Sequence, residues 1–284
     1  MSGNATALIG DVWDWLVGPY YSEHGTRYTS FADKRVENWP LLDIRMAIAV
    51  SLAYLLGIPL LMRFMKHREP MKIKRFAALH NAILFSLSLY MCVETVRQAY
   101  NNFGWGQKFS LWCNPFEAGP DPFTKSGYAL ARVLWIHYLS KAYEFVDTFI
   151  MILKKNTRQI SFLHVYHHAT TFFPVWWSVI AYGAGGETWF CCALNSFIHV
   201  MMYGYYFFAT FGIKLAVMKP FVTYSQMIQF LLFIAQGVYL LGTDCFRPRL
   251  VVVLLVFQCA IFFLLFANFA YKAYWKPKPK SKTR

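Results

Sequence analysis

Long apolar segments recur along almost the whole chain after residue 40, and they limit the possible folds more than any other feature. Each is close to the roughly 20 residues that a helix needs to cross the hydrocarbon core of a bilayer. Only 15% of the 284 residues are charged, whereas a soluble domain usually has about 25%. The sequence therefore predicts an all-α, polytopic membrane protein.

The expected transmembrane helices are seven in number. They cover about residues 42–62, 78–98, 126–153, 162–182, 187–210, 222–241 and 249–271. No linker rich in Pro, Gly or Ser separates them, so we expect one membrane domain, residues 41–272. A lumenal N-terminal segment, 1–40, would precede it, and a basic cytosolic tail, 273–284, would follow.

The net charge of +14 could indicate a nucleic-acid-binding protein, but the basic residues lie in short loops between apolar segments. The loops after the first, third and fifth spans, together with the tail, hold most of the Lys and Arg residues. Such loops remain on the cytosolic side of a membrane. The pattern predicts a lumenal N-terminus, a cytosolic C-terminus and no nucleic-acid partner.

Shorter signals agree with this topology. Lys280 and Lys282 give the tail the form of a dilysine retrieval signal, which indicates the endoplasmic reticulum membrane. Asn4 begins a glycosylation sequon on the expected lumenal side. Cys113 and Cys245 both fall in expected lumenal loops, where a disulfide is permitted, although two separate thiols remain the alternative.

The third span carries four polar residues, Lys141, Glu144, Asp147 and Thr148. Their spacings of three, six and seven put them near one face of a helix. Ionisable side chains are costly within a membrane, so each is a candidate for a functional site. The alternative is internal ion pairing that only locks helices together, and it is compatible with an active-site role.

The fourth span opens with His164, His167 and His168, whose spacing crowds three imidazoles on one helical face. A lone His in a span is usually a core residue, but packing does not readily explain three at this spacing. This pattern indicates a functional site.

The fifth and sixth spans contribute further polar residues at helical spacing. Stripes of Met and Tyr are more often core than site, so Asn195, His199 and Tyr203 are the stronger candidates. Glutamines in a span can also simply bond neighbouring helices. The weaker candidates are Tyr206, Thr223, Gln226 and Gln229.

The expected depths of these groups coincide. With a rise of about 1.5 Å per residue, the polar residues of four spans fall in one layer on the cytosolic side. A polar pocket above an apolar interior suits acyl-CoA, which has a charged head and an apolar tail. Lys154 and Lys155 in a basic loop could hold the CoA phosphates, or could serve only to set topology.

Two other functions compete. A di-iron desaturase or hydroxylase also uses a His-x-x-His-His box, but needs about eight imidazoles from several boxes. The chain has eight His, yet His80 and His137 have no His partner at three to five residues, so it has one complete box only.

A proton-coupled transporter would need polar residues through the full membrane depth. In covalent acyl transfer, by contrast, a His of the box would supply the nucleophile, since none of the six Cys is expected in the polar layer.

Four motifs stand complete and in order on consecutive spans. They are Lys141-x-x-Glu144-x-x-Asp147-Thr148, His164-x-x-His167-His168, His199-x-x-Met202-Tyr203-x-Tyr205-Tyr206 and Thr223-x-x-Gln226-x-x-Gln229. With them, residues 40–275 closely resemble the ELO-type very-long-chain fatty acid elongases, which are 3-oxoacyl-CoA synthases. The resemblance implies that the second to seventh spans form a six-helix barrel around an acyl tunnel.

The resemblance also implies the reaction, in which a long-chain acyl-CoA condenses with malonyl-CoA to give 3-oxoacyl-CoA, CO₂ and CoA. His167 is expected to form an acyl-imidazole, and His199 with Asn195 to assist malonyl-CoA decarboxylation. His164, His168 and Asp147 would orient the imidazoles. The expected substrate-binding residues are Lys141, Glu144, Thr148, Tyr203, Tyr206, Gln226, Gln229, Lys154 and Lys155.

The resemblance implies no cofactor and no metal. It implies partner enzymes for the later steps of the cycle, two reductases and a dehydratase, and a homodimer is also an expected partner arrangement. The segment Leu163-His164-Val165-Tyr166-His167-His168 is more similar to elongases of polyunsaturated chains than to those of saturated chains.

Overall fold

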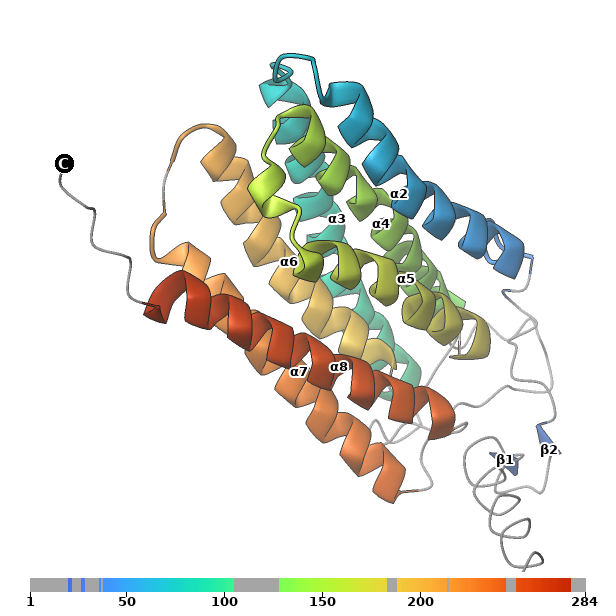
Figure 1. Ribbon diagram of the computed structural model, residues 1–284. Coiled ribbons are helices and arrows are strands. Elements are labelled where there is room, and N and C mark those ends of the chain that lie inside the picture. Colours follow the sequence, from blue (N-terminus) through green and yellow to red (C-terminus); the bar gives the residue numbers. More distant parts are fainter. Residues whose placement is uncertain are drawn as a thin grey trace, which may run out of the picture.

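The computed structural model describes residues 20–21, 27–28, 36, 38–104, 128–182, 188–213, 215–243 and 249–276. Long α-helices make up most of this part of the chain (Figure 1). They are α2 (Ile44–Met65), α3 (Lys74–Gly104), α4 (Tyr128–Leu153), α5 (Phe162–Tyr182), α6 (Thr188–Thr210), α7 (Met218–Gly242) and α8 (Arg249–Ala270). The smaller elements are a 3₁₀ turn η1 (Thr157–Gln159), a π-helical turn η2 (Tyr271–Trp275) and the antiparallel strands β1 (Tyr20–Tyr21) and β2 (Arg27–Tyr28).

Each of these seven helices coincides with an expected span, which confirms the prediction of a helical, multi-pass membrane protein. α3 extends beyond its expected span at both ends, because hydropathy marks only the apolar part of a helix. Within the described residues, four helical segments are apolar enough, by length and composition, to cross a membrane: Ile44–Met65, Lys74–Tyr100, Met218–Gly242 and Arg249–Trp275. The polar motifs lie mainly on α4, α5 and α6, which lowers the hydropathy of those three helices.

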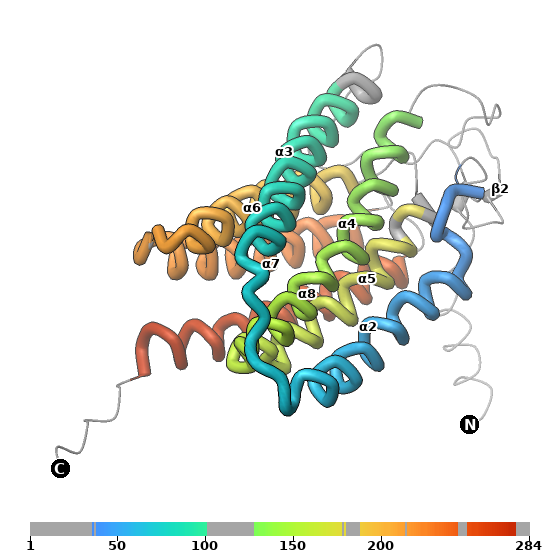
Figure 2. Tube along the Cα trace, turned by 90° about the horizontal axis from the view of Figure 1, so that it is seen from above, coloured from blue at the N-terminus to red at the C-terminus, as the bar shows by residue number. Residues whose placement is uncertain are grey.

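Six of the helices form a closed ring. α3 packs on α4, α4 on α5, α5 on α8, α8 on α7, α7 on α6, and α6 returns to α3. α2 lies outside the ring against α4 and α5 (Figure 2). The expected barrel of the second to seventh spans is therefore present, while an acyl tunnel through it stays a prediction.

A side-chain cap and three hydrogen bonds from the ring fix the start of α2. The carboxylate of Asp43 caps the helix by accepting from the backbone N–H of Arg45 at 2.8 Å. The guanidinium of Arg45 also bonds this carboxylate and lowers the pKa of Asp43 to about 2. Three side chains of α4 and α5 then donate to the backbone just before the helix: Trp135 to Pro40, Tyr138 to Leu41 and Trp176 to Leu42.

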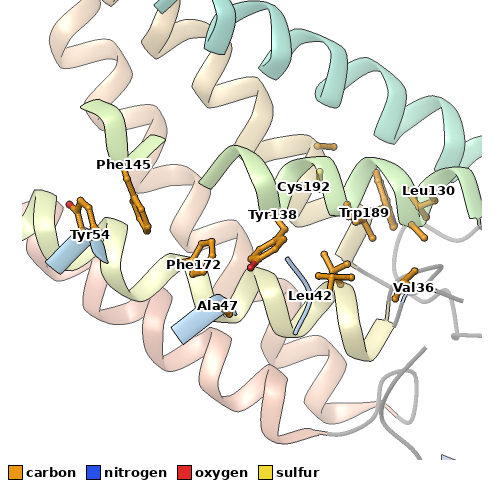
Figure 3. Packing of buried hydrophobic residues seen from close by; sticks show 14 of the residues in the cluster. Val36, Leu42, Ala47, Tyr54, Leu130, Tyr138, Phe145, Phe172, Trp189 and Cys192 are labelled. Atoms are coloured by element: carbon orange, nitrogen blue, oxygen red, sulfur yellow. The ribbon is translucent and has the colours of Figure 1, made fainter. Parts of the chain in front are cut away.

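An apolar cluster joins α2 to α4 and α5 (Figure 3). Tyr54 stacks on Phe145 with ring centroids 4.1 Å apart, and Phe145 in turn contacts Phe172 at 5.6 Å. Tyr138 packs on the other side of Phe172 at 4.8 Å. Burial of these large rings holds α2 at a fixed depth along α4.

Several basic loops gather at one end of the bundle, which we call the basic end and define as residues 63–75, 154–161, 218–219 and 272–276. The N–H of Met71 donates to the carbonyl of Leu153 at 2.9 Å, which ties the α2–α3 connection to the end of α4. The indole of Trp275 donates to the hydroxyl of Tyr224 at 2.9 Å, so η2 lies against the start of α7. The basic end therefore brings together loops that are far apart in the sequence.

Candidate active site

A buried ion pair lies between α4 and α6. The ammonium of Lys141 donates to Oε1 of Glu144 at 2.9 Å and to Oδ1 of Asn195 at 2.8 Å. Lys141 is 3% exposed and Glu144 is 1% exposed. A buried charge is tolerated only when it is paired and hydrogen-bonded. The spacing of three on α4 makes the pair possible, and Asn195 completes it from the facing helix.

The same carboxylate oxygen also faces an imidazole. Nδ1 of His199 lies 3.3 Å from Oε1 of Glu144. Oγ of Ser140, whose hydroxyl donates to the carbonyl of His137 at 2.8 Å, lies 3.4 Å from the same oxygen. A carboxylate beside a ring nitrogen favours the ring proton on that nitrogen and restricts rotation of the imidazole.

A second carboxylate joins three helices of the ring. Asp147 of α4 is bonded through Oδ1 to Nε2 of His80 on α3 at 2.9 Å. Its Oδ2 accepts from the hydroxyl of Tyr203 on α6 at 2.8 Å. Among the described side chains, these two are the hydrogen-bond partners of Asp147, which was expected to orient the imidazoles of the box.

The residue that hydrogen-bonds to the box is the neighbour of Asp147. Oγ1 of Thr148 lies 2.8 Å from Nε2 of His164 and 3.0 Å from the hydroxyl of Tyr54. Thr148 is fully buried. Its hydrogen bonds connect Tyr54 of α2 to the box, and its expected role in binding substrate stays a prediction.

The three imidazoles of the box lie together. The His164 and His168 rings are 4.5 Å apart, and the His167 and His168 rings are 5.4 Å apart. His168 is enclosed by aromatic rings, with Tyr54 and Phe145 each 6.2 Å away. The box therefore packs against α2 and α4 through His168.

His167 contacts apolar rings of α8. Its ring lies 5.0 Å from Phe262 and 6.5 Å from Phe266, both on α8. Phe262 belongs to an apolar cluster with Phe230 and Phe233 of α7. His167 therefore stands at the boundary between the polar network and the apolar interior.

The candidates on α7 do not join this network directly. The hydroxyl of Thr223 pairs with Tyr274 of η2 at 3.1 Å, and Gln226 donates to the sulfur of Met202 at 3.8 Å. Gln229 is buried, and its Oε1 has no hydrogen-bond partner within the part of the chain that the structure describes. Thr223 therefore lies near the basic end, and Gln226 lies beside α6.

The remaining candidates lie at the edges of the site or outside the described residues. Tyr206 is 39% exposed and packs edge-on against Tyr203 at 6.0 Å. Lys154 is half-buried and Lys155 is exposed, and both lie at the basic end. Outside the described residues fall Cys113, Cys245, Asn4, Lys280 and Lys282.

Sequence reasoning missed three residues of the network: His80, Tyr54 and Ser140. His80 was set aside because it has no His nearby in the sequence, but its partner is a carboxylate on another helix. Tyr54 gave no signal because a single Tyr in an apolar span is commonplace. Within the described ranges, no group of three or more His, Cys, Asp and Glu side chains is arranged to hold a metal ion.

Comparison with known proteins identifies the family of the chain. The profile of the ELO: GNS1/SUR4 family matches residues 39–282. Very long chain fatty acid elongase 4 of Homo sapiens is 37% identical over 257 residues, which cover 89% of this chain and 79% of that protein. Very long chain fatty acid elongase 2 of Mus musculus is 34% identical over 261 residues, with coverage of 88% and 83%.

A third relative, very long chain fatty acid elongase 5 of Mus musculus, is 40% identical over 207 residues, covering 72% of this chain and 66% of that protein. A profile match over most of the chain, together with identities of this size, establishes membership of the family. The chain therefore belongs to the GNS1/SUR4 family and is a membrane-embedded condensing enzyme of fatty acid elongation.

Proposed function

We propose that the protein condenses a long-chain acyl-CoA with malonyl-CoA through an acyl-imidazole on His167. The position of His167, between the polar network and the apolar cluster of α7 and α8, is the observation that carries this proposal. An acyl-CoA molecule has the same two-sided character, because its CoA portion is charged and its acyl chain is apolar.

His167 has the environment of a nucleophile. His164 hydrogen-bonds Thr148, and Nδ1 of His199 lies 3.3 Å from Glu144, so each of these rings has a polar neighbour. Among the described residues, the ring nitrogens of His167 have no hydrogen-bond partner, and the nearest rings are His168 and Phe262. A neutral imidazole with an uncommitted lone pair can attack a carbonyl carbon.

The first half-reaction transfers the acyl group. A lone pair on a His167 ring nitrogen forms a bond to the thioester carbon, the carbon–sulfur bond breaks, and CoA leaves as a thiolate that takes up a proton. The acyl chain would then lie against the apolar cluster that contains Phe230, Phe233 and Phe262. Burial of that chain supplies binding free energy of roughly 0.8 kcal/mol for each CH₂ group.

The second half-reaction forms the new carbon–carbon bond. Malonyl-CoA loses CO₂, and the electron pair of the broken bond remains on the α-carbon of the resulting acetyl-CoA carbanion. This carbon attacks the acyl-imidazole and releases the neutral ring of His167. His199, held by Glu144 at 3.3 Å, is positioned to stabilise the enolate that develops on the thioester oxygen.

The substrate class is a separate part of the proposal. We propose that polyunsaturated acyl chains are preferred, in line with the segment Leu163–His168. Lys154 and Lys155 at the basic end would bind the CoA phosphates, since ammonium groups attract phosphate as point charges.

The reaction as written uses no metal and no redox cofactor. The 3-oxo product then requires reduction, dehydration and a second reduction by partner enzymes.

We further propose that the enzyme resides in the endoplasmic reticulum membrane, with the basic end and the C-terminus in the cytosol. The concentration of Lys and Arg at the basic end and the positions of Lys280 and Lys282 support this orientation. Insertion of glycosylation sites into successive loops would test it. Glycosylation of a loop at the basic end would contradict the orientation.

The central test uses purified protein in detergent with labelled malonyl-CoA and a panel of saturated and polyunsaturated acyl-CoAs. Wild-type protein should form labelled 3-oxoacyl-CoA, and His167→Ala should form none. His67→Ala is the matched control, because it removes an exposed imidazole in a loop. Mass spectrometry after incubation with acyl-CoA alone should show one acyl group on His167. Full turnover by His167→Ala would refute the acyl-imidazole.

A further inference from the structure

We propose that Tyr54, on the helix outside the ring, is a positioning residue that sets the tautomer of His164 through Thr148. The inference rests on the proposed function for its catalytic consequence, but its structural part stands alone. α2 contacts α4 and α5 from outside, and Tyr54 is the residue of α2 that hydrogen-bonds into the site. It therefore extends the active site to a helix that contributes none of the family motifs.

The hydrogen bonds form a short chain across three helices. The Tyr54 hydroxyl lies 3.0 Å from Oγ1 of Thr148, which lies 2.8 Å from Nε2 of His164. Tyr54 is 1% exposed and Thr148 is 0% exposed, so bulk water does not compete for these bonds. Each hydroxyl has one proton, and the direction of the chain is set by where each proton can go.

Only one direction bonds both hydroxyl protons. If Tyr54 donates to Thr148, Thr148 donates to Nε2 of His164, and both hydroxyl protons are bonded. In the reverse direction Thr148 donates to Tyr54, whose own proton then has no other acceptor among the described residues. A buried donor without a partner is costly. The chain therefore makes Nε2 of His164 the acceptor and leaves the ring proton on Nδ1.

Packing holds Tyr54 in the required position. Its ring stacks on Phe145 at 4.1 Å with an interplanar angle of 17° (Figure 3), and Phe149 lies at 6.2 Å. One turn further along α2, a Cβ at Gly57 would lie 3.3 Å from Phe149. The absence of a side chain at Gly57 thus allows α2 to approach α4 closely enough for the hydroxyl of Tyr54 to reach Thr148.

The tautomer matters because the imidazoles of the box touch one another. The His164 ring packs on His168 at 4.5 Å, and His168 packs on His167 at 5.4 Å. A His164 ring free to exchange its proton between nitrogens would also reorient, and this would disturb the stack that supports His167. Loss of the hydroxyl of Tyr54 should therefore slow acyl transfer without weakening the binding of the acyl chain.

The test compares Tyr54→Phe with Tyr138→Phe. Both variants remove one hydroxyl from a buried Tyr ring, but the hydroxyl of Tyr138 bonds the carbonyl of Leu41, away from the His box. We expect Tyr54→Phe to lower kcat by about tenfold, the effect of one lost hydrogen bond, with an unchanged KM for acyl-CoA. Tyr138→Phe should retain the wild-type kcat.

A second variant tests the relay itself. Thr148→Val should lower kcat at least as much as Tyr54→Phe, and the double variant should be no slower than Thr148→Val alone. Additive losses in the double variant would overturn the relay. Thr148→Ser, which restores the hydroxyl, should recover most of the activity.

The tautomer is read directly by ¹⁵N NMR of histidine-labelled protein, with the His164 signals assigned from His164→Gln. Wild type should show an unprotonated Nε2, and Tyr54→Phe should show a mixture of tautomers. An unchanged tautomer in Tyr54→Phe, or a kcat equal to that of Tyr138→Phe, would overturn the inference. If wild type makes no 3-oxoacyl-CoA, the proposed function fails, whereas the NMR result still decides the role of Tyr54.

Discussion

Glu144 of α4 and His199 of α6 face each other, with Oε1 of Glu144 3.3 Å from Nδ1 of His199. The same oxygen accepts a hydrogen bond from Lys141 at 2.9 Å. One carboxylate therefore both neutralises a buried ammonium and orients an imidazole. The internal ion pairing considered from the sequence is therefore present, and the same cluster includes His199, for which a catalytic role is proposed.

Removal of the charge on Lys141 should destabilise the protein strongly. Lys141→Met leaves the carboxylate of Glu144 buried without its cation, and a broken buried pair typically costs roughly 3–5 kcal/mol. Unfolding in detergent, followed by circular dichroism against temperature, measures this loss. Arg45→Ala, which breaks an exposed pair with Asp43, is the control and should be nearly neutral.

The double variant Lys141→Met/Glu144→Leu separates stability from chemistry. It removes both buried charges, so most of the lost stability should return. The imidazole of His199 would still lack its orienting carboxylate, and condensation should remain impaired. Recovery of full activity in this variant would show that Glu144 serves packing alone.

His80 should prove necessary for the shape of the site. His80→Leu removes the donor to Oδ1 of Asp147, and an unpaired polar group in such a setting costs about 1–3 kcal/mol. His80→Gln retains an amide donor and should restore part of the loss. The measurements are the thermal midpoint and kcat with one acyl-CoA. A His80→Leu protein as stable and active as wild type would contradict this role.

Gly237 is required for the close packing of α7 on α8. A Cβ at this position would overlap Cγ2 of Val256, and overpacking of this kind costs typically 1–3 kcal/mol. We therefore expect Gly237→Ala to lower the thermal midpoint, and Gly237→Ala/Val256→Ala to recover it. Gly242→Ala is the matched control, since nothing lies within 4 Å of its added Cβ.

The ring of helices should be weakest between α5 and α8, whose contact is sparse compared with that of α3 and α6. Gln258 of α8 donates to the hydroxyl of Thr170 on α5 at 2.7 Å. Loss of this bond in Gln258→Leu should lower the free energy of unfolding by roughly 0.5–1.5 kcal/mol. Asn81→Leu, which removes a 3.3 Å bond to Thr210 between the tightly packed α3 and α6, should cost less. Equal losses of the free energy of unfolding in the two variants would contradict the prediction.

Much of the fold could be predicted from local sequence. The length of an apolar segment sets whether a helix can cross a bilayer, and this property needs no knowledge of the other helices. The predicted span 162–182 coincides with α5, and 249–271 differs from α8 by one residue at its end. Helical spacing also placed Lys141 beside Glu144, because residues three apart on a helix are neighbours.

The partners across helices required the tertiary structure. Spacing put Asp147 and Thr148 near the same face of α4, yet Asp147 bonds His80 and Tyr203 while Thr148 bonds Tyr54 and His164. These choices depend on how each helix is rotated about its axis and how closely it approaches its neighbours. Periodicity along one helix holds no such information. The sequence alone determined a helical membrane enzyme with an imidazole box, and only the packing of the helices decided which groups contact each imidazole.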